Sequence, residues 1–205
     1  FNGYGGDNNQ AENLVYINDQ LFQLEKRDEK LYIKTYGNTQ KGSVKLKKGM
    51  QVVTQAARDV NADILVLQMG SNGGWDSYDE LIAQYQAMIE KSGTQCYIII
   101  GDTDNPTEAY DSEQYESDIE VGTKDNVWET ALREAFGEHF INMRAFMIEY
   151  GLETAGLDPT EQDLDDLANG RVPEQLKDDY THFNSYGYYA MGAAVYQKGV
   201  ELGYW

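Results

Sequence analysis

Asp63-Ile64-Leu65-Val66-Leu67-Gln68-Met69-Gly70-Ser71-Asn72 is the stretch that decides the fold. Its nearly continuous apolar run before Gly70 is the pattern of a strand covered on both faces of a parallel sheet. A loop begins where this strand ends, and ligands of open α/β sheets bind at the carboxyl ends of the strands. The stretch therefore predicts an α/β fold with a functional loop that starts at Gly70.

The residues after this loop complete a β-α-β unit. Ser77 to Glu80 has the pattern of a capping box at a helix N-terminus. Leu81, Tyr85, Met88 and Ile89 then follow at the spacing of one helix face, which Gly93 ends. The apolar run from Cys96 to Ile100 predicts a second buried strand, parallel to the first.

The rest of the C-terminal region predicts further helices and one short strand. Helices are expected at about 126–136, 144–150, 158–168 and 185–202, and the strand at 140–143. We expect Val127, Leu132 and Phe136 on the inner side of the first of these helices. In the last helix, Tyr188, Met191, Val195 and Leu202 have the spacing of an inner face.

The N-terminal region has a different character. Residues 14–17, 21–24 and 30–36 carry strand-forming side chains, and Leu31, Ile33 and Thr35 alternate with polar or aromatic residues as in a half-buried antiparallel strand. Residues 1–60 hold nine Lys/Arg and seven Asp/Glu, a net charge of +2, whereas residues 61–205 hold seven and 28, a net charge of −21. This change predicts a small antiparallel β insertion at 1–59 and an α/β domain at 60–205.

Composition excludes several classes of function. The net charge of −19 argues against nucleic acid and anionic membranes as partners, and no apolar run is long enough for a transmembrane helix. The acidic loop at 101–126 has Pro106 where a calcium loop needs an oxygen ligand, so we expect no metal. The chain begins at Phe1, without an initiator Met, and we interpret it as processed or cut from a longer protein.

Asp179-Tyr180-Thr181-His182 precedes the last predicted helix. If His182 is a general base, Asp179 is placed to hold the imidazole in one tautomer. The alternative is an exposed loop histidine beside one of many acids. The second histidine, His139, has no acid at a comparable spacing, and we interpret it as structural or exposed.

Two of these motifs together resemble the SGNH (GDSL-type) esterase/lipase family. Its Gly-x-Asn block matches Gly70-Ser71-Asn72, and its Asp-x-x-His block matches Asp179-Tyr180-Thr181-His182. Phe140 to Arg144 and Val200 to Trp205 also look like members of the family, and the resemblance covers residues 60–205.

The resemblance implies a flavodoxin-like three-layer sandwich with a parallel sheet and a carboxylic-ester hydrolase that uses no cofactor. His182 would be the base, Asp179 its orienting carboxylate, and Asn72 with Gly70 the donors to the oxyanion. The substrate would be a small-molecule or carbohydrate ester.

The nucleophile that the family needs has no counterpart here. Its Gly-Asp-Ser follows the first strand of the fold, but none of the seven serines has that setting. Thr103 in Gly101-Asp102-Thr103 is an alternative, although the order of the blocks does not fit it. Gly6, in Gly5-Gly6-Asp7, could supply a backbone oxyanion donor, or it could belong to the β insertion.

We therefore predict that the first strand and its serine lie upstream of this chain. In a doubly wound sheet that strand is central, and without it the neighbouring strands expose unpaired edges. The missing segment would be supplied by another chain, often one still attached after cleavage, or something else would fill its place.

Two rivals stay open. One is a non-catalytic carbohydrate-binding module derived from a degenerate esterase; the 16 tyrosines and three tryptophans suit sugar stacking and core packing equally well. The other is a structural interaction domain, which accounts for the acidity but not for the ordered motifs. The acidic, Tyr-rich composition with a single cysteine suits a secreted or cell-surface bacterial protein, without excluding a cytoplasmic one.

Overall fold

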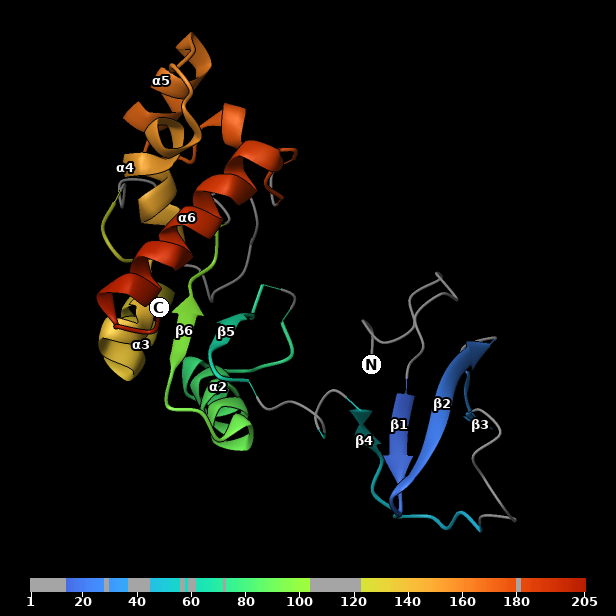
Figure 1. Cartoon of the computed structure of the whole chain (residues 1–205). Coiled ribbons are helices and arrows are strands. Elements are labelled where there is room, and N and C mark those ends of the chain that lie inside the picture. Colours follow the sequence, from blue (N-terminus) through green and yellow to red (C-terminus); the bar gives the residue numbers. More distant parts are fainter. Residues whose placement is uncertain are drawn as a thin grey trace. The chain divides into compact units, whose positions relative to one another are not determined.

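The structure is a computed structural model, drawn in Figure 1. It describes residues 14–27, 30–36, 45–55, 58, 62–71, 73–103, 123–179 and 182–205. The chain divides into two compact units, residues 1–61 and residues 62–205, where the sequence predicted a boundary between 59 and 60. Each unit has its own sheet and its own core.

The first unit is built on a four-stranded antiparallel sheet of order β3-β2-β1-β4. Asn18 and Asp19, both with positive φ, join the first two strands in a two-residue turn of the kind that matches the twist of a hairpin. Buried side chains of β1 and β2 form the core. The predicted small antiparallel module is confirmed. Its strands are β1 (Leu14–Ile17), β2 (Gln20–Arg27), β3 (Lys30–Thr35) and β4 (Val53–Thr54).

The half-buried character predicted for residues 30–36 is wrong. All six residues of β3 are exposed, including Leu31 at 51% and Ile33 at 41%. β3 is at the edge of the sheet and pairs with β2, while the core lies under β1 and β2. Alternation along a strand shows that its two faces differ, but not that either face is covered.

The second unit has a parallel sheet, which confirms the α/β class. Its order is β5 (Leu65–Gln68), β6 (Tyr97–Ile100) and β7 (Phe140–Ile141). β5 and β6 pair over four residues, and β6 pairs with β7 over two. The helices of this unit are α2 (Tyr78–Ser92), α3 (Val127–Phe136), α4 (Met143–Ala155), α5 (Glu161–Ala168) and α6 (Ser185–Glu201), with short 3₁₀ turns at Gly137–His139 and Glu174–Leu176.

β6 divides the core of this unit between two sets of helices. Ile99 packs in a cluster with residues of α2 and α3, among them Tyr85 and Leu132. Ile98 and Ile100 belong to a separate cluster with residues of α4 and α6. Successive side chains of a strand point to opposite faces, so each face of β6 has its own helices. The flavodoxin-like arrangement stays a prediction, because it involves more strands than the three described.

β5 departs from the prediction that both its faces are covered. Leu65 and Leu67 are partly buried, but Val66 is 42% exposed and Gln68 is exposed as well. Within the described ranges, β6 is the one strand hydrogen-bonded to β5, so β5 is an edge strand. Its apolar sequence is that of a central strand, yet one face and one edge have no neighbour among these residues.

Two residues expected on inner helix faces are exposed instead. Val127, the first residue of α3, is 51% exposed, and Trp128 beside it takes the buried position. Tyr188 of α6 is 55% exposed, because the buried face of α6 carries small residues, including Gly187. A Cβ at Gly187 would lie 2.2 Å from the Leu176 carbonyl oxygen, so this close approach requires glycine.

Candidate functional site

Asp179 and His182 form a hydrogen-bonded pair in the loop before α6. The imidazole Nδ1 lies 2.8 Å from Asp179 Oδ2 and 3.0 Å from Oδ1, and the backbone N–H of His182 donates to Oδ1 at 2.7 Å. An ionised carboxylate only accepts hydrogen bonds, so Nδ1 carries the proton and Nε2 is the basic ring nitrogen of the neutral form. The side chains are 64% and 47% exposed.

The loop that carries this pair is fixed on both sides. Lys177 and Phe183 form an isolated antiparallel bridge, and Asp178 N–H donates to the His182 carbonyl oxygen at 2.8 Å. Asn184 caps the N-terminus of α6, and its Nδ2 donates to the carbonyls of Gln175 and Lys177. The dyad therefore sits at the surface on a backbone that the core holds in place.

Gly70, two residues after the end of β5, lies in a closely packed setting. Its φ is +119°, and a Cβ would lie 2.5 Å from Cζ2 of Trp128. The indole N–H of Trp75 donates to its carbonyl oxygen at 2.9 Å. Close packing and backbone conformation thus account for a glycine at position 70, independently of any role of its N–H in binding an oxyanion.

Tyr85 of α2 fixes the residue before Gly70. Its hydroxyl accepts the Met69 N–H at 2.8 Å and donates to the Met69 carbonyl oxygen at 2.7 Å. Burial raises the pKa of this phenol to about 12, more than the hydrogen bond with the Met69 backbone lowers it. Tyr85 therefore holds the end of β5 as a neutral group.

The structure brings two sequence motifs together at the carboxyl ends of β5 and β6. Ser71, from the Gly-x-Asn motif, donates its hydroxyl to Asp102 Oδ1 at 3.2 Å. Thr103, the alternative nucleophile, donates its backbone N–H to the same oxygen at 2.7 Å. Asp102 is 9% exposed and links the two loops. The β5 loop and the β6 loop thus form one edge, as expected for parallel strands.

Several predicted site residues lie outside the described part of the chain. Asn72, the main oxyanion candidate, and Gly6 are among them. The same holds for Ser43, Ser112 and Ser117. The other serines besides Ser71 have local roles: Ser77 caps α2, Ser92 donates to the Ile89 carbonyl, and Ser185 begins α6.

His139 is structural, as predicted. Its ring stacks on Tyr97 with centroids 4.1 Å apart, and its Nδ1 lies 3.0 Å from the Tyr97 carbonyl oxygen and 2.9 Å from the Tyr204 hydroxyl. The ring thus links Tyr204 to β6, and this structural role explains the presence of His139 without a catalytic one.

A buried polar network near the same sheet edge was missed in the sequence. Arg144 and Glu129 pair through two hydrogen bonds, and Asn142 Nδ2 donates to Glu129 Oε2 at 2.9 Å and to Asp125 Oδ1 at 2.8 Å. Arg144 also donates to the Lys124 carbonyl oxygen at 2.7 Å. The only signal was Asn142 and Arg144 inside an otherwise apolar stretch, Phe140 to Phe146. This network anchors the chain where it re-enters the described region at residue 123.

Neither a metal centre nor a membrane span is found in the described ranges. They hold no group of three or more metal-ligating side chains, and none of their helices is both long and apolar enough to cross a bilayer. The acidic loop considered for calcium falls mostly at 104–122, outside these ranges.

Comparisons with protein-family models, with curated proteins and with solved structures gave no match to this chain.

Proposed function

We propose that this chain carries the general base of a carboxylic-ester hydrolase of the SGNH (GDSL-like) type. The observation that supports the proposal most is the contact between His182 Nδ1 and Asp179 Oδ2 at 2.8 Å. It is the geometry in which a carboxylate fixes the tautomer of a catalytic histidine.

In this mechanism a serine hydroxyl attacks the ester carbonyl carbon while His182 Nε2 takes its proton. Asp179 stabilises the imidazolium that forms, and the proton then goes to the leaving alcohol. The side-chain amide of Asn72 and the backbone N–H of Gly70 would donate to the oxyanion. Water, with His182 again as base, hydrolyses the acyl-enzyme. The substrate would be a small-molecule or carbohydrate ester.

The serine would come from a further strand that pairs with the outer edge of β5. Val66 is 42% exposed on an apolar strand, and in the described residues β6 alone is hydrogen-bonded to β5. An additional strand there would give β5 a neighbour on both edges, as the flavodoxin-like order requires, and would bring a strand-end serine to the edge that holds Gly70 and Ser71.

The experiment is an assay with p-nitrophenyl acetate, on the chain alone and on the chain joined to the polypeptide encoded upstream. We expect His182-dependent turnover in the longer protein and none in the shorter one. Equal rates for the longer protein and its His182→Ala variant would contradict the proposal. Asp178→Asn is the matched control. Asp178 is close to the dyad in sequence, but its hydrogen bond to His182 comes from its backbone N–H and not from its carboxylate.

A further inference from the structure

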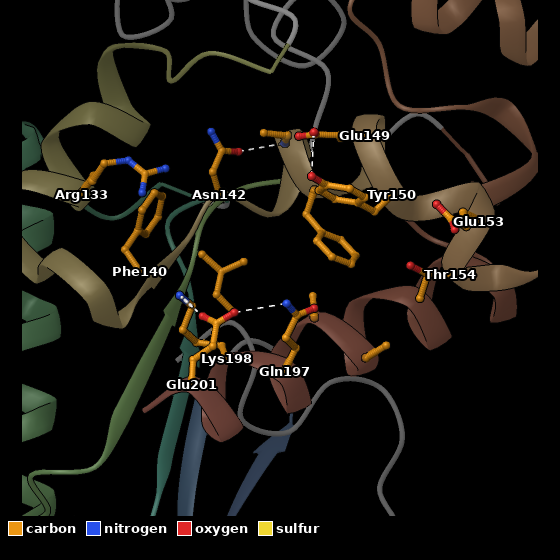
Figure 2. Close-up of a pocket in the computed structure, with 15 residues that line it drawn as sticks. Arg133, Phe140, Asn142, Glu149, Tyr150, Glu153, Thr154, Gln197, Lys198 and Glu201 are labelled. Atoms are coloured by element: carbon orange, nitrogen blue, oxygen red, sulfur yellow. Dashed lines mark hydrogen bonds and ion pairs between the residues drawn. The ribbon is translucent and has the colours of Figure 1, made fainter. Parts of the chain in front are cut away.

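A groove lies between α4 and α6 in the second unit (Figure 2). Its volume is about 900 Å³, and β7 and α3 close one end. The α6 residues that line it begin at Ala193 and end at Glu201, about 12–24 Å along the helix from Ser185. The groove is therefore separate from the loop that carries Asp179 and His182. Its volume is that of a small-molecule site.

Polar side chains face each other across this groove. Figure 2 shows Glu149 and Tyr150 on α4 opposite Gln197 and Glu201 on α6. The Tyr150 hydroxyl donates to Glu149 at 2.7 Å, and this hydrogen bond raises its pKa. Glu201 accepts from Lys198 at 2.8 Å and from Gln197 at 3.2 Å, and the lysine lowers the carboxyl pKa. The walls thus present ionised acceptors, a phenol and a primary amide.

The charges of the groove argue against an anionic ligand. The lining holds three glutamates against one arginine and one lysine, a net charge of −1. Both cations are already engaged, since Lys198 pairs with Glu201 and Arg133 pairs with Asp125. A phosphate or carboxylate would meet excess negative charge and no cation without a partner.

The floor of the groove is apolar and partly aromatic. Small side chains, Ala145 and Ala193, leave the space open, and Phe146 packs against Tyr150 with ring centroids 5.7 Å apart. Tyr150 is 46% exposed, so part of its ring is available for contact. An aromatic face beside carboxylates that accept hydrogen bonds suits a ligand ring that is apolar on one face and carries hydroxyl groups around its rim.

We propose that this groove binds a neutral saccharide. One pyranose face would pack on Tyr150, and the sugar hydroxyls would donate to Glu149 and Glu201 and accept from Gln197. This inference is independent of the proposed esterase, because it uses none of the residues of the Asp179 loop.

The test is a titration of the ¹⁵N-labelled chain with four neutral trisaccharides, maltotriose, cellotriose, xylotriose and N,N′,N″-triacetylchitotriose, followed by NMR. Spermidine and inorganic phosphate serve as the charged probes. We expect at least one trisaccharide to shift the resonances of Tyr150 and Gln197 with a Kd of about 1 mM or below. Tyr150→Ala should weaken that binding about tenfold.

Tyr189→Ala is the matched control, because Tyr189 is a 66% exposed tyrosine of α6 that does not line the groove. Binding that Tyr189→Ala abolishes and Tyr150→Ala leaves unchanged would place the sugar elsewhere and overturn the proposal. Shifts at the groove with spermidine or phosphate but with no trisaccharide would also overturn it, as would no shift with any probe.

Discussion

Arg144 and Glu129 form a bidentate ion pair inside the second unit. Arg144 Nε and Nη2 lie 2.8 and 2.7 Å from the two carboxylate oxygens, and the side chains are 1% and 3% exposed. Glu129 also accepts the backbone N–H of Asn126 at 2.8 Å, so it caps α3 as well. Removing one partner of such a pair leaves the other charge buried.

Arg144→Met should therefore lower the free energy of unfolding by about 3–5 kcal/mol. Urea denaturation followed by circular dichroism measures this loss. Arg133→Met is the control, because the Arg133 side chain is 49% exposed in its pair with Asp125, and its loss should cost about 1 kcal/mol or less. Similar losses of unfolding free energy in the two variants would contradict the account, because they would show that the stabilising effect of the Arg144 pair does not depend on its burial.

Gly70→Ala should destabilise the second unit through backbone strain and overpacking. A Cβ at this position would overlap the Trp128 ring, and φ is +119°. We expect a loss of about 2–4 kcal/mol from the two effects together. Gly73→Ala has a positive φ but open space around its Cβ, so it should cost only about 1 kcal/mol. Thermal unfolding with tryptophan fluorescence compares them, and equal costs would contradict the packing role of Gly70.

Tyr85 should make stability sensitive to alkaline pH. Its folded pKa, about 12, lies above the ordinary value of 10.0, so its contribution is complete below pH 10 and is lost as pH rises towards 12. The stability difference between the protein and its Tyr85→Phe variant should fall over this range by about 2–3 kcal/mol. Urea unfolding at several pH values measures it. A difference that stays constant with pH would mean that the phenol ionises equally in both states.

Asp179→Asn tests the orienting role within the proposed mechanism. An amide in place of the carboxylate can favour the wrong tautomer of His182, so kcat in the longer protein should fall by about a thousandfold or more. KM should change little, because Asp179 is not expected to touch the substrate. Asp178→Asn should leave both constants unchanged. A loss confined to KM would assign Asp179 to substrate binding instead.

The sequence predicted local features of the fold well. Ser77 caps α2 through the Glu80 N–H at 3.2 Å, as its pattern indicated, and the apolar runs at β5 and β6 became paired parallel strands. The reciprocal half of the expected capping box is different, since Glu80 accepts the N–H of Asp76 instead of Ser77. Short-range chemistry decides a helix start, so it can be read from a few neighbouring residues.

Tertiary placement could not be predicted in the same way. The exposure of Val66 depends on what packs over that face of β5 and on which strand lies beside it, and nothing within β5 records this. The pairing of Glu129 with Arg144 depends on how α3 and α4 meet. For the site, a separation of three residues was enough to predict the contact between Asp179 and His182. The groove between α4 and α6 was not predicted, because its lining residues come from several separate elements and no local pattern records how these meet.

The central claim is that His182 serves a serine held on a strand beside β5. Labelling with a fluorophosphonate probe tests it most directly, with the chain joined to its upstream polypeptide and mass spectrometry to locate the adduct. We predict one labelled serine, located in the added segment, and loss of labelling in His182→Ala but not in Asp178→Asn. No labelling, or labelling that persists without His182, would contradict the account.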